Sequence, residues 1–143
     1  MSDLPCCDRI EELSFFVAGT PAPQGSKRHV GGGRMVEQSK RLPAWRKAVT
    51  EAGVEALAGR PGFDNHVALV CSLTFYLHRG VTVTRPLPTV TPDKDKLERA
   101  VNDALTKAKV WGDDAQITDG STKKRYADEC VTGVQITIRK ATQ

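Results

Sequence analysis

Four short segments of the chain alternate apolar and polar side chains, and each of them predicts a strand. They cover residues 13–18, 67–77, 115–125 and 131–138. The segment 67–77 has one strongly apolar face and one mixed face, while Val134, Ile136 and Ile138 give the last segment the alternation of a half-buried strand. Residues 127–129 make the turn between the last two segments, which we expect to close the sheet as a pair.

Two further segments repeat apolar residues with the spacing of a helix. Residues 42–58 form the first, because Pro43 suits the first helical position and Gly59 and Pro61 end the segment. Residues 95–107 form the second, with a continuous apolar stripe along one face, and prolines mark residues 81–92 as an extended connection. The order β-α-β-α-β-β predicts an α+β fold in which a mixed sheet carries two main helices on one face.

Composition and charge place the chain among soluble globular proteins of one domain. It has 143 residues, 21 Lys and Arg against 17 Asp and Glu, and no apolar run as long as a membrane-spanning helix. Residues 1–12 form an acidic N-terminal tail without the features of a secretory signal, so we expect a single intracellular domain over residues 13–143. Basic residues concentrate in residues 21–60 and 121–143, on either side of an Asp-rich middle. This layout fits a metal-dependent nuclease as well as an ordinary charged surface.

Two pairs of carboxylates flank the second predicted helix and are candidate ligands of Mg²⁺. Asp93 and Asp95 lie at its start, and Asp113 and Asp114 follow its end. A helix of this length is about 20 Å long, so the pairs meet in one chain only if residues 110–113 fold back along it. Helix capping and turn formation also explain aspartates at these positions, and spacing alone does not choose between the two explanations.

Three runs of the sequence carry a family resemblance: TPDKDKL at residues 91–97, NDAL at 102–105 and WGDDAQI at 111–117. Together they closely resemble the RusA-type Holliday junction resolvases. The segment GTPAPQGSK at residues 19–27 looks like the phage and prophage branch of that family. The resemblance implies a homodimeric, Mg²⁺-dependent endonuclease of the bacterial or phage-infected cytoplasm. It would cut four-way DNA junctions with paired nicks, and Mn²⁺ would substitute for Mg²⁺.

The resemblance also implies roles for individual residues. Asp93, Asp95 and Asp114 would bind the metal, with Asp113 as a weaker candidate. Arg99 stands where the family has a catalytic lysine; it keeps the charge for stabilising the transition state but cannot readily donate a proton. Lys96 likewise stands where the family favours asparagine. The bases expected to contact DNA are Lys27, Arg28, Arg34, Lys40, Arg41, Lys123 and Lys124.

Other functions remain open at the level of the sequence. The protein could be a branched-DNA-binding protein with weak or lost cleavage, a nuclease for forks or flaps, or an interaction module whose aspartates only cap and turn. The residue that enters the junction centre is also undetermined. The candidates are the segment 29–36 and the aromatic residues Phe15, Phe16, Trp45 and Trp111, for each of which a core position is the first expectation.

Overall fold

A computed structural model describes residues 10–25 and 34–142, with the side chains of residues 34–39 left out. Its elements follow one another as β1 (Glu12–Ala18), α2 (Arg34–Leu57), β2 (Leu69–Leu77), α3 (Lys94–Lys107), the short 3-10 helix η1 (Asp114–Gln116), β3 (Ile117–Tyr126) and β4 (Gly133–Lys140). The predicted α+β fold and its order of elements are confirmed. Most of the acidic tail, and the candidates Lys27 and Arg28, lie outside the described residues.

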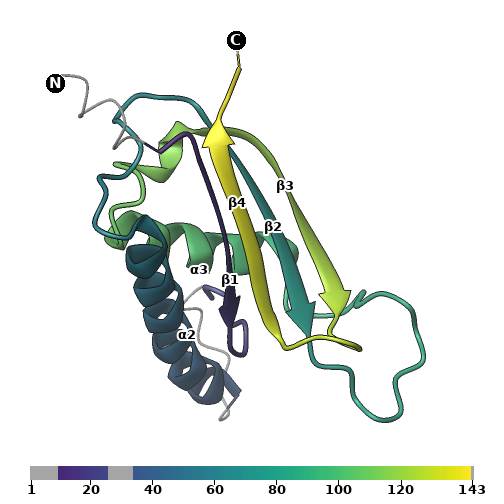
Figure 1. Ribbon diagram of the computed structural model, residues 1–143. Helices are drawn as coiled ribbons and strands as arrows, with labels where there is room; N and C mark the ends of the chain where they lie inside the picture. Colours follow the sequence, from purple (N-terminus) through teal and green to yellow (C-terminus); the bar gives the residue numbers. More distant parts are fainter. Residues whose placement is uncertain (1–9, 26–33, 143) are drawn as a thin grey trace, which may run out of the picture.

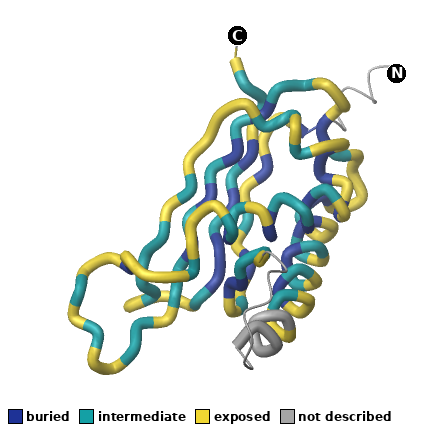
Figure 2. Tube along the Cα trace, turned by 180° about the vertical axis from the view of Figure 1, so that it is seen from behind, coloured by how far each residue is buried: buried dark blue, intermediate teal, exposed yellow. Residues whose placement is uncertain are grey.

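The sheet has the strand order β1-β4-β2-β3. Strand β4 is antiparallel to both β1 and β2, whereas β2 and β3 run parallel. Both helices lie on one face of this mixed sheet (Figure 1). Burial follows the same division, because the helix-facing residues of β2 and β4 are buried and the intervening ones are more exposed (Figure 2). The single-sided arrangement that the alternating pattern predicts is therefore confirmed.

The last two strands are not the closing pair that the sequence predicts. Strand β4 crosses to the middle of the sheet and β3 stays at its edge. The polarity of the two strands agrees with this order: Val134, Ile136 and Ile138 of β4 are fully buried, which suits a central strand. Strand β3 carries mostly polar side chains and is largely exposed, which suits an edge.

Helix α2 begins at Arg34, well before the predicted start, and Pro43 lies inside it. The prediction that Pro43 opens the helix is therefore wrong. The apolar stripe that reveals this helix starts only near Trp45, which is buried against the sheet together with Val49. The preceding turns are mostly polar, so hydrophobic periodicity carries no signal for them.

Helix α3 matches its prediction closely. Its stripe of Leu97, Ala100, Val101, Ala104 and Leu105 is buried, which leaves the opposite side of the helix free to present polar groups. None of the described helices is long and apolar enough to cross a membrane.

Candidate active site

The two carboxylate pairs lie at opposite ends of α3. Asp93 is the N-cap of this 14-residue helix and Asp95 is in its first turn, whereas Asp114 begins η1 after the helix has ended. The intervening segment packs on the last turn, since the Val110 N–H donates to Leu105 O (3.1 Å) and Trp111 Nε1 donates to Thr106 Oγ1 (2.7 Å). Asp93 and Asp95 therefore lie at the start of a helix about 20 Å long, and Asp114 lies toward its other end, within electrostatic reach of Asp103. Within the described ranges, no three Asp, Glu, His or Cys side chains gather as a metal site.

Asp93 and Asp95 present exposed carboxylates at the N-terminus of α3. Asp93 adopts an extended N-cap conformation but makes no side-chain capping hydrogen bond. Its nearest cation is Lys96, at 3.9 Å between Nζ and Oδ2, and both side chains are about half exposed. Asp95 is exposed as well. This pair of carboxylates can bind a hard cation, with water and phosphate completing its shell.

Lys124 fixes the segment that leads into Asp93. Its ammonium donates to Val90 O and Pro92 O, each at 2.8 Å. Lys123, the residue before Lys124 in β3, is exposed. It points to the other face of the sheet, because side chains alternate along a strand. The two lysines that the sequence offers as equivalent phosphate contacts therefore occupy different environments.

Asp113 caps the start of η1, as the capping explanation predicts. Its carboxylate accepts from the Ala115 N–H (3.1 Å), and Gln116 Oε1 accepts from the Asp113 N–H (3.1 Å). Gln116 Nε2 in turn donates to Val67 O (2.9 Å) and ties η1 to the segment before β2. Sequence analysis missed this glutamine, although the spacing of Asp113 and Gln116 is that of a capping box.

Asp114 is the half-buried member of its pair. Burial raises the pKa of its carboxyl group, and so do the hydrogen bond it shares with Asp113 and the negative charges of Asp113 and Asp103. Such a site penalises the ionised carboxylate in the isolated chain. A bound cation or a cationic side chain would remove that penalty.

The basic candidates occupy two elements. Arg99 is exposed on α3, one turn beyond Asp95, and Lys40 and Arg41 are exposed on α2. The side chain of Arg34 is outside the described ones. Among the aromatic candidates, Trp45 and Trp111 are buried in the core, Phe15 packs against it, and Phe16 is 39% exposed.

Comparison with known protein families gives one match. A family model described as endodeoxyribonuclease RusA matches residues 18–139, which run from the last residue of β1 into β4 and include both carboxylate pairs. No curated protein matches the chain.

Proposed function

The chain belongs to the RusA family of endodeoxyribonucleases, and we propose that it cuts four-way DNA junctions by paired nicks that depend on Mg²⁺. The observation that carries this proposal is the pair of exposed carboxylates, Asp93 and Asp95, at the start of α3. We assign the activity to DNA recombination and repair, or to phage DNA processing, in the bacterial cytoplasm.

The donor set fits a hard divalent cation. Asp93 and Asp95 offer carboxylate oxygens that no capping hydrogen bond occupies, and Mg²⁺ needs only one or two carboxylates besides water and phosphate. When bound, the ion would polarise the scissile phosphate and lower the pKa of an attacking water. Mn²⁺ accepts the same oxygen ligands and would substitute.

The neighbouring residues then have distinct tasks. Arg99 lies on the exposed side of α3 and would offset negative charge that develops on the phosphate. Lys124 holds the segment before Asp93 and so keeps the carboxylate in place. Lys40 and Arg41 extend positive charge along α2, where we expect the DNA backbone to pass.

We infer that Asp114 serves the metal site of a second copy of the chain. Asp114 follows the far end of α3, and among the described residues no three Asp, Glu, His or Cys side chains gather as a metal site, so Asp114 does not join the Asp93 pair within one chain. A twofold dimer supplies it without any change of fold, because each copy lends its Asp114 to the other. The same twofold axis would place two equivalent sites on two strands of one junction.

Junction cleavage by the wild type and by Asp95→Asn, in Mg²⁺, Mn²⁺ or EDTA, tests the activity. We expect paired nicks with either metal, none in EDTA and none with Asp95→Asn. Asp119→Asn is the matched control, since Asp119 is an exposed aspartate of β3 away from both pairs, and it should cut normally. Continued cutting by Asp95→Asn would refute the metal assignment. Junction binding without nicks would favour a DNA-binding protein that has lost catalysis, which the arginine at position 99 makes a specific alternative.

Subunit mixing tests the shared site. Asp95→Asn and Asp114→Asn are each expected to be inactive, but a mixed dimer contains one site with both changes and one site with neither. Co-refolded subunits should therefore recover nicking of one strand per junction. If each site lay within one chain, every site of the mixed dimer would carry one change, and no activity would return.

A further inference from the structure

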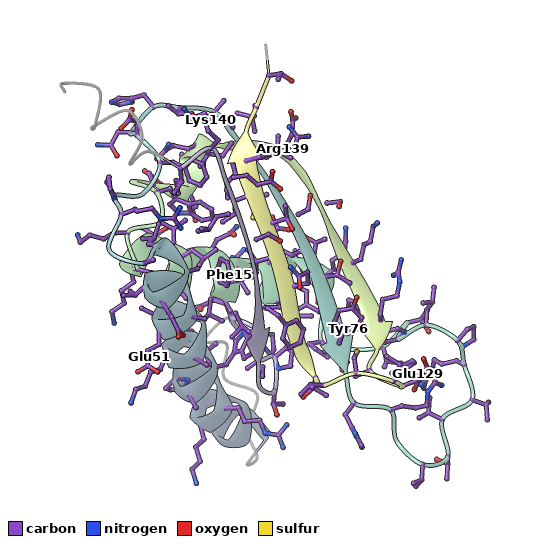
Figure 3. All side chains as sticks on the ribbon, viewed as in Figure 1. Phe15, Glu51, Tyr76, Glu129, Arg139 and Lys140 are labelled. Atoms are coloured by element: carbon purple, nitrogen blue, oxygen red, sulfur yellow. The ribbon has the colours of Figure 1, made fainter. Side chains whose placement is uncertain are left out.

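A cavity of about 550 Å³ opens at the end of the sheet beside the start of α3. Thr91 and Pro92 line it, and they immediately precede Asp93. Arg41 of α2 lines it from another side, and Tyr126 closes it at the end of β3. Tyr76, near the end of β2, marks this end of the sheet in Figure 3. The cavity therefore adjoins the carboxylate pair but is formed by different residues.

The lining suits a group that is partly anionic and partly apolar. Arg41, His78 and Arg85 bring basic nitrogens to the cavity, and none of the described lining residues carries a carboxylate. The connection between β2 and α3 adds an apolar wall with Val83 and Val90. A phosphate would be attracted to the bases, and a flat, uncharged ring would be accepted by the wall.

A dense set of hydrogen bonds fixes the rim of this cavity. Arg79 holds Asp128 with two bonds of 2.7 and 3.0 Å, and its Nη1 donates to Val83 O (3.2 Å) and Arg85 O (2.7 Å). The Arg79 guanidinium also lies 4.2 Å from the centre of the Tyr126 ring. The connection has no helix or strand of its own, yet this clamp ties it to the segment after β3, near Glu129 in Figure 3.

Arg85 belongs to the same network, since its Nη1 donates to the Tyr126 hydroxyl at 3.0 Å. Its guanidinium is thus oriented by a residue that also lines the cavity. A pocket that is held open in the isolated chain needs little rearrangement to receive a ligand, which favours binding.

We propose that this cavity receives one unpaired nucleotide of the junction strand, next to the phosphate that is cut. The proposal rests on the proposed junction cleavage. The volume lies within the range of small-molecule pockets, roughly 300–1,000 Å³. Extruding a base costs least where stacking is already broken, as at a branch point. The cavity would then make cleavage depend on branching.

Junctions with 2-aminopurine at single positions around the branch point test this inference. The full-length protein is added with Ca²⁺ in place of Mg²⁺, so that binding is observed without cutting. We expect the fluorescence of one position next to the mapped nick to rise by about threefold when that base leaves the stack. Val83→Trp, which fills the cavity, and Arg41→Ala should abolish the rise. Lys47→Ala, an exposed charge change on the same helix, should leave it unchanged.

A second measurement separates this site from the proposed function. Val83→Trp should reduce the preference for cutting a junction over linear duplex by about tenfold. On a junction with a one-nucleotide gap at that position, the same variant should lose less cutting activity. Normal nicking without a fluorescence rise at any position would overturn the nucleotide site and leave the resolvase assignment intact. Failure of the wild type to bind any junction would overturn both.

Discussion

Replacing Lys124 with methionine tests whether the segment before Asp93 has to be held in place. Methionine keeps an aliphatic stem but removes the hydrogen bonds to Val90 O and Pro92 O, one exposed and one half-buried. Bonds to a charged group contribute about 1.5–3 kcal/mol when sheltered and less in water, so we expect a loss of roughly 2 kcal/mol in the free energy of unfolding. For 143 residues this lowers Tm by roughly 6 °C. A carboxylate displaced by about 1 Å can cost about 100-fold in rate, and junction nicking should fall accordingly.

Lys123→Met is the matched control, because it removes the same charge from the neighbouring, exposed position of β3. It should leave Tm unchanged. If Lys123 contacts a phosphate, this variant should instead weaken junction binding and reduce the slope of log affinity against log salt by about 0.9. Differential scanning fluorimetry and single-turnover cleavage measure the two effects. If Lys124→Met kept the Tm and the nicking rate of the wild type, the positioning role of Lys124 would be refuted. An equal loss of Tm in Lys123→Met and Lys124→Met would refute it too.

Three further predictions concern the remaining charged groups and thiols. Asp114→Asn should raise Tm at neutral pH, because the raised pKa of Asp114 means that its ionised form destabilises the fold. As the pH falls through the acidic range, Asp114 of the wild type takes up a proton, and the difference in Tm between the two proteins should disappear. Arg79→Ala should speed proteolysis within residues 78–92 without changing the far-UV circular dichroism, since the guanidinium clamp is the main tie of that connection. Burial raises the pKa of the Cys71 thiol to about 12, so peptide mapping after iodoacetamide treatment should show far slower labelling of Cys71 than of exposed Cys130.

Hydrophobic periodicity predicted the elements whose apolar residues are buried in the core. The stripe of α3 and the alternation of β2 are each buried on the expected side, and their bounds agree closely with the prediction. Periodicity gave no prediction for helical turns that do not pack on the core. The polar first turns of α2 contribute nothing to the apolar stripe, so the prediction that the helix begins at Pro43 is wrong.

Strand neighbours were harder to predict than strands, because alternation does not encode which strand lies beside which. The short link between β3 and β4 suggested a hairpin, yet β4 lies between β1 and β2. The full burial of Val134, Ile136 and Ile138 suits the central position of β4. Comparing the polarity of β3 with that of β4 would have placed β3 at the edge.

The site itself shows the limit of reading chemistry from spacing. The family resemblance implies that Asp93, Asp95 and Asp114 bind one metal, and the buried stripe of α3 fixes the helix that lies between the two pairs. The packing that makes α3 a stable helix keeps its two ends apart, and Val110 and Trp111 anchor the segment after it in the core. In the proposed dimer, the three carboxylates would serve one ion where two chains meet with their α3 helices in opposite directions. Each chain would then contribute to two sites, which is why subunit mixing tests the assignment more directly than any single substitution.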